Sequence, residues 1–138
     1  MTVTAAIALV CIAMLFGGMA FFAACIAPLV FTRLPPEWAG RFIRGVFPVY
    51  YLWVLGTAAA GAVALMPVRP ADAGALALVA GATVWLRQSL MPRINALSDA
   101  AQAGDTGAKA AFDRAHRLSV AVNLAQMLVA VVVLVRFA

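Results

Sequence analysis

The sequence predicts an all-α integral membrane protein, a four-helix bundle with up-down-up-down topology. Of its 138 residues, 66% are hydrophobic and only 11% are charged, whereas soluble domains are about 45–50% apolar and about one quarter charged. The mean hydropathy is +1.02. Four runs poor in charge have about the 20 residues needed to cross ~30 Å of hydrocarbon. We therefore expect a single transmembrane domain over residues 1–138.

The four predicted spans cover residues 4–32, 45–68, 73–91 and 118–135. Residues 1–32 contain no charged residue. A secretory signal begins with a basic region, so we expect this first span to be retained. The second and third spans are separated by Pro67 and Pro70, which forbid helix continuation. These two spans are therefore predicted to form a transmembrane hairpin.

The third and fourth helices are expected to extend beyond the membrane. Residues 92–117 are the only long polar stretch, and their middle, residues 103–107, consists of small and turn-forming residues. The third helix is predicted to continue to about Gln102. The fourth is predicted to start near Thr106, with that threonine as its cap. Each arm would project roughly 15–18 Å into the cytoplasm.

Basic residues are distributed unevenly between the two sides of this bundle. Only Arg69 and Arg136 fall on the side of the termini, against eight on the other side: Arg33, Arg41, Arg44, Arg87, Arg93, Lys109, Arg114 and Arg117. The positive-inside rule then places both polar loops in the cytoplasm and both termini in the periplasm. The preference for Arg over Lys, with abundant Ala, indicates a bacterial inner membrane. The net charge of +5 reflects this asymmetry and contact with anionic lipid, not nucleic-acid binding.

Polar residues form one stripe at the start of the fourth helix. His116, Ser119, Asn123 and Gln126 are spaced by three, four and three residues, so they share one face of a helix. Lipid penalises exposed Asn and Gln, so this face must meet other helices or a polar cavity. Two interpretations stay open: hydrogen bonds that join helices, or a site for a ligand, proton or metal.

Flanking charges place further polar residues at the same depth as this stripe. Arg87 lies six residues further into the membrane than Arg93 along the third helix, and Asn123 lies six residues further in than Arg117 along the fourth. Tyr50 lies six beyond Arg44, which gives a common depth of about 9 Å. Arg87 would snorkel towards the surface, pair with Asn123 or a tyrosine hydroxyl, or bind an anion. The predicted ligand site comprises Tyr50, Tyr51, Arg87, His116, Ser119, Asn123 and Gln126.

Small residues indicate close helix packing. Gly17 and Gly18 are adjacent, and Ala73, Ala77 and Gly81 recur every four residues. Such positions let helices approach closely within or between chains. We therefore expect a homodimer in the lipid bilayer.

Four strings carry a family resemblance: residues 27–31 (APLVF), 47–51 (FPVYY), 91–95 (MPRIN) and 112–119 (FDRAHRLS), followed by Asn123. In this order they resemble the transmembrane-protein-205-like family. The resemblance implies a four-helix membrane domain whose bacterial members are catalogued as a domain of unknown function, and whose human relatives are associated with resistance to platinum drugs. The family pattern matches at Pro28, Pro48, Tyr51, Pro92, Asn95, Phe112, His116, Ser119 and Asn123. The layout is also distantly similar to membrane haem and copper-handling families.

Three classes of function stay open. The first is a non-enzymatic membrane protein that binds a small ligand, or a haem or metal through His116. Since the chain has one histidine, two imidazoles would meet only across a dimer. The second is an oligomeric transporter or efflux component for a small molecule or metal, and the third is a structural or assembly protein. An enzyme is less expected, because all five acidic residues lie in or near loops.

Overall fold

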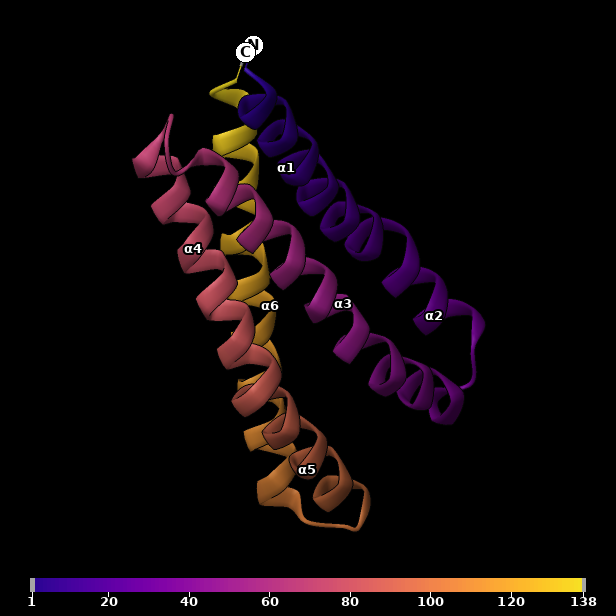
Figure 1. Cartoon of the computed structure of the whole chain (residues 1–138). Helices are drawn as coiled ribbons and strands as arrows, with labels where there is room; N and C mark the ends of the chain where they lie inside the picture. The colour runs from indigo at the N-terminus through magenta and orange to yellow at the C-terminus, as the bar shows by residue number, and fades with distance from the viewer. Residues whose placement is uncertain (1, 138) are drawn as a thin grey trace.

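The computed structural model describes residues 2–137, and within them every regular element is a helix (Figure 1). The elements are α1 (Val3–Phe21), the π-helical turn η1 (Phe22–Ile26), α2 (Ala27–Arg33), α3 (Pro36–Leu65), α4 (Pro70–Trp85), the π-helical turn η2 (Leu86–Leu90), α5 (Met91–Gln102) and α6 (Thr106–Val135). The prediction of an all-α protein is confirmed.

Both π-helical turns lie just before a proline. Pro28 and Pro92 each occupy the second position of the helix that follows, α2 and α5. The residue before each proline donates its backbone N–H to the carbonyl five residues earlier. Ala27 donates to the Phe22 carbonyl, and Met91 donates to the Leu86 carbonyl. Proline lacks an N–H and clashes with the preceding turn, and a π-bulge widens the helix locally. The irregularity caused by Pro28 is thus spread over the preceding turn.

Within the described residues, three helical stretches are long and apolar enough to cross a membrane. They are Val3–Arg33, Pro36–Leu65 and Thr106–Val135. The predicted third span, residues 73–91, is not among them. It ends in the consecutive polar residues Arg87, Gln88 and Ser89, which make this stretch less apolar than the others.

The helices pack around α3 and α6. Helix α3 contacts α1 and α4, and α6 contacts α1, α4 and α5. In Figure 1 both termini and the turn between α3 and α4 lie at one end of the molecule, the terminal end. The α2–α3 and α5–α6 connections lie towards the other, the loop end, where α2 and the start of α3 diverge from α5.

The two ends have separate cores. The larger core, towards the terminal end, is formed by Ala8, Ile12, Leu15, Met19, Val54, Ala58, Ala62, Leu65, Ala73, Leu76, Val79, Ala130 and Val133. The smaller core, towards the loop end, has only Tyr51, Leu86, Leu90 and Ala115 as buried members. The helices are therefore most firmly packed near the termini.

Close helix contacts depend on two glycines. A Cβ on Gly61 would lie 3.0 Å from Leu76 and 3.6 Å from Cys11, where α1, α3 and α4 meet. A Cβ on Gly18 would collide with Trp53, whose indole N–H donates to the Met14 carbonyl at 3.2 Å. Of the small residues predicted to mediate packing, Ala73 is fully buried. Within the described chain no atom lies near enough to Gly17 or Gly81 to contact a Cβ, so these two positions do not mediate packing between its own helices.

The predicted helix ends at the loop end are confirmed, but the cap is a different residue. Helix α5 ends at Gln102, and α6 begins at Thr106. The side chain that accepts from the Ala108 N–H, at 3.0 Å, is that of Asp105 and not of Thr106. Gly104 precedes it with φ of +100°, a conformation that favours glycine.

Candidate functional site

A cavity of about 410 Å³ lies between the first helical stretch, α3, α5 and α6. Its wall is mostly apolar and aromatic. The polar side chains that line it are those of Arg44, Tyr50, Tyr51, Asn95, Ser98, His116, Ser119 and Asn123. The volume falls within the range of about 300–1,000 Å³ that is typical of small-molecule sites.

Helical spacing explains how these side chains reach one cavity. On α6, the face that carries His116, Ser119 and Asn123 turns towards it, as expected for residues spaced by three and four. On α3, Arg44 and the two tyrosines lie about two turns apart along the same side. The structure therefore brings together five of the seven predicted site residues.

One hydrogen bond on the cavity wall joins α3 to α6. The Tyr50 hydroxyl donates to Oδ1 of Asn123 at 3.1 Å, and Nδ2 of Asn123 donates to the Ser119 carbonyl at 2.8 Å. The Ser119 hydroxyl in turn donates to the His116 carbonyl at 2.8 Å. The Asn123 amide is thus fixed by both of its ends.

Aromatic rings surround this hydrogen bond. The ring of Phe22 lies 4.7 Å from Tyr50 and 5.5 Å from Phe47, and the ring of Tyr51 lies 5.4 Å from Tyr50. These are favourable separations for aromatic pairs. These four aromatic side chains form one part of the cavity wall.

Nearer the loop end, two side chains on the wall have uncommitted polar groups. Neither the Asn95 amide nor the His116 imidazole makes a hydrogen bond with another side chain or backbone group of residues 2–137. The exposed imidazole stacks on Phe112, with ring centroids 5.8 Å apart and an interplanar angle of 6°. These groups are available to a polar ligand.

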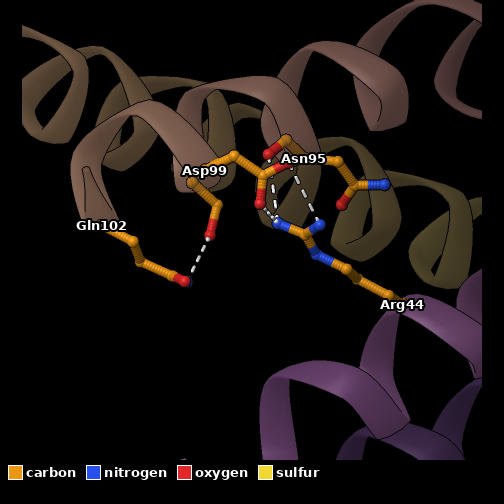
Figure 2. A network of polar contacts seen from close by, with 5 residues as sticks. Arg44, Asn95, Asp99 and Gln102 are labelled. Carbon is orange, nitrogen blue, oxygen red and sulfur yellow. Dashed lines mark hydrogen bonds and ion pairs between the residues drawn. The ribbon is translucent and has the colours of Figure 1, made fainter. Parts of the chain in front are cut away.

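An arginine bridges the divergent helices at this end. Arg44 of α3 reaches across to α5, where it forms an ion pair with Asp99 at 2.5 Å and donates to the Asn95 carbonyl at 3.1 Å (Figure 2). The hydrogen bond from Arg44 lowers the pKa of the Asp99 carboxyl below its ordinary value. Arg44 also lines the cavity, so this bridge closes one side of it.

Two of the predicted site residues lie outside the cavity lining. Gln126 is buried against α4, where its Nε2 donates to Thr83 Oγ1 at 2.9 Å and to the Val79 carbonyl at 3.1 Å. It joins two helices, as the interhelical interpretation of the stripe requires. Nε of Arg87 makes a long contact of 3.5 Å with the Pro48 carbonyl. Arg87 therefore meets α3 but neither Asn123 nor a tyrosine hydroxyl.

His116, the candidate metal ligand, belongs to no cluster of metal-binding side chains within the described residues. Within residues 2–137 there is no group of three or more His, Cys, Asp or Glu side chains that could hold a metal ion. His116 has Phe112 as its stacking partner and no acidic or thiol neighbour that would complete such a group. The expectation of a metal or haem held through His116 gains no support within a single chain.

Sequence reasoning missed several polar residues of the site and core. Arg44 and Asp99 lie on separate helices, and no spacing rule connects them. Asp72 lies in the first turn of α4, near a loop as expected, but its side chain is 3% exposed and pairs with Arg136 at 2.7 Å and Arg69 at 3.8 Å. The signal that could have revealed this pairing is that Arg69 and Arg136 are the two basic residues predicted at the terminal end, and both pair with this one carboxylate.

A family model describing a domain of unknown function (DUF4149) matches residues 10–103, which is 94 of 138 residues. The chain belongs to the DUF4149 family. The DUF4149 match includes the cavity walls contributed by α3 and α5 and stops before α6, which supplies His116, Ser119 and Asn123. No curated protein and no solved structure gives a significant match.

Proposed function

We propose that this DUF4149 protein is a membrane protein that binds a small amphipathic molecule in the cavity between its divergent helices. The observation that carries this proposal is the composition of the cavity wall. Aromatic and aliphatic side chains supply most of it, and a few polar groups come from three different helices. Apolar walls with few convergent polar groups are typical of small-molecule sites.

The polar groups at the mouth of the cavity would orient the ligand. Asn95 and His116 lie near the loop end, and the Tyr50–Asn123 hydrogen bond lies deeper, among aromatic rings. A molecule with a polar group at one end and an apolar body fits this order. The apolar body would pack against Phe22 and Phe47, while the polar group would meet the amide and the imidazole.

The ligand is proposed to enter from the bilayer. Phe31 and Leu124 both line the cavity, yet they are 63% and 58% exposed. Helix α2 packs on α3 and not extensively on α6. The cavity is therefore continuous with the apolar outer surface, where a molecule dissolved in lipid would arrive.

Binding is favoured over transport because the cavity occupies only one end of the chain. Towards the termini, the larger core fills the space between α1, α3, α4 and α6 with buried side chains. A solute that enters the cavity meets this core and not a second opening. Ligand binding is also favoured over a purely structural role, because a structural role gives no use to the cavity and its polar groups.

The proposed membrane topology and location follow from the distribution of basic residues. Eight basic residues at the loop end against two near the termini favour an up-down four-helix bundle with both termini in the periplasm of a bacterial inner membrane. Helices α5 and α6 would then extend into the cytoplasm. Assembly as a homodimer and membership of the transmembrane-protein-205-like group are further parts of this proposal.

The test compares two adjacent alanines of η1. Ala23 lines the cavity, whereas Ala24 does not, and both are exposed. The full chain in nanodiscs is irradiated with a diazirine-bearing fatty acid, and the adducts are located by peptide mass spectrometry. We expect labelling of cavity residues on α3 and α6 in the native chain, about tenfold weaker labelling in Ala23→Trp, and unchanged labelling in Ala24→Trp.

The indole of the Ala23 variant fills the cavity, which is the physical reason for the loss of labelling. Far-UV circular dichroism and gel filtration verify that both variants fold. Equal labelling in the two variants would contradict the proposal. So would labelling of the native chain confined to outward-facing residues such as Leu128, which is 63% exposed and does not line the cavity.

A further inference from the structure

A second, smaller hollow lies between η2–α5 and α6, with no residue in common with the cavity. Its volume is about 170 Å³, and it is lined by Leu90, Arg93, Ala111, Arg114, Ala115 and Leu118. Two arginines from different helices thus line one hollow. A water molecule occupies about 30 Å³ of liquid, so the hollow has room for a group of several oxygen atoms.

These two arginines lack the carboxylate partners that half of the ten basic residues have within the described chain. Within residues 2–137, ion pairs engage Arg41, Arg44, Arg69, Lys109 and Arg136. Arg93 and Arg114 appear in no ion pair or side-chain hydrogen bond of the described chain. Two like charges at one hollow repel each other, and a bound anion would relieve that repulsion.

The remaining walls of the hollow are apolar and border the membrane-spanning part of α6. Leu90 and Ala115 are buried at its floor, and Leu118 is 46% exposed at its edge. On the same face of α6, three and four residues beyond Leu118 towards the middle of the helix, lie Ala121 and Val122. The hollow therefore joins a cationic end to an apolar helix surface.

We propose that Arg93 and Arg114 bind the phosphate of an anionic phospholipid, with its acyl chains along α6. Guanidinium groups bind phosphate oxygens through paired, charge-assisted hydrogen bonds. Basic pockets between helices at a membrane surface are known to receive lipid headgroups. This site does not depend on the proposed cavity ligand, because the two sets of lining residues are distinct.

The experiment uses the full chain in mild detergent and native mass spectrometry to count bound lipids. Phosphatidylglycerol is titrated against phosphatidylcholine with the same acyl chains. We expect the affinity for phosphatidylglycerol to fall about twenty-five-fold in the double variant Arg93→Gln/Arg114→Gln, given about a fivefold effect for each lost charge. Phosphatidylcholine should bind weakly to both proteins.

The matched control is Arg33→Gln/Arg117→Gln, which removes two basic residues that also lack ion pairs in the described chain but lie outside the hollow. It should retain phosphatidylglycerol within about threefold of the native affinity. Circular dichroism verifies the helix content of both doubles.

Three outcomes would overturn the proposal. Equal losses in the two double variants would assign lipid binding to overall charge. Equal binding of phosphatidylcholine would indicate an apolar groove without headgroup recognition. Displacement of the lipid by inorganic phosphate at the same concentration would identify a soluble anion as the ligand.

Discussion

The terminal end and the loop end of this molecule are built from the same four helical stretches but are packed differently. Thirteen buried hydrophobic residues form the core towards the termini, whereas four form the core near the loops. The loop end instead contains a cavity of about 410 Å³. Close approach at Gly61 brings three helices together in the first region, while the Arg44 bridge joins α3 to α5 in the second. The comparison indicates that one end provides stability and the other provides space for a ligand.

The largest expected effect comes from truncating the core of the terminal end. Leu76 is fully buried, so Leu76→Ala should lower the free energy of unfolding by about 2–5 kcal/mol, through lost burial and the void left behind. Ile94→Ala should cost less than about 1 kcal/mol, because Ile94 already borders the cavity. Detergent-induced unfolding in bicelles, followed by circular dichroism, measures both. Equal losses would remove the distinction between the two ends.

A smaller effect is expected from the buried carboxylate near the termini. Asp72 is 3% exposed and lies 2.7 Å from Arg136, so Asp72→Asn should lower the free energy of unfolding by about 1–2 kcal/mol. This is less than for a fully buried pair, because the arginine is 58% exposed and screened by solvent.

The matched control for this variant is Asp113→Asn at the loop end. Its pair with Lys109, at 3.5 Å, is exposed on both sides, and the change should stay within about 0.5 kcal/mol. A larger loss in the Asp113 variant than in the Asp72 variant would reverse the comparison between the two ends. The same unfolding assay applies.

The smallest expected effect is a change in the distance between α3 and α5 at the loop end. Asp99→Asn should broaden the distribution of distances between spin labels placed at Phe42 on α3 and Ala96 on α5. The labels are introduced into a chain whose two cysteines are replaced by alanine. The physical reason is that the bridge from Arg44 to Asp99 and Asn95 joins these helices. Electron–electron double resonance measures the distribution. An unchanged distribution would show that the bridge does not set the width of this end.

The pH dependence of this bridge has a definite sign. Because the Arg44 hydrogen bond lowers the pKa of Asp99 from its ordinary 3.8, the bridge should be fully present above pH 3.8. The bridge should be lost only as the pH falls through the lower pKa that Asp99 has in the folded protein. The native spacing should therefore be constant from pH 8 to pH 5. Broadening within that window would assign the change to a group other than Asp99.

The sequence by itself determined the composition-driven and local features of this protein. High hydropathy and four apolar runs predicted an all-helical membrane protein, and turn-forming residues after Gln102 predicted both adjoining helix ends. These features could be predicted because they depend on burial in lipid and on the conformational preferences of short segments.

Only the tertiary structure decided which polar residues share a site. The periodic stripe on α6 placed Asn123 and Gln126 together, but Asn123 meets Tyr50 of α3, whereas Gln126 meets Thr83 of α4. Periodicity defines a face of a helix, but it does not specify which neighbour covers that face at each height. Here the helices diverge towards the loops, so the neighbour changes along α6. The cavity and the Arg44 bridge follow from that divergence, whereas the pairing of buried Asp72 with Arg136 is a contact distant in sequence at the other end of the molecule.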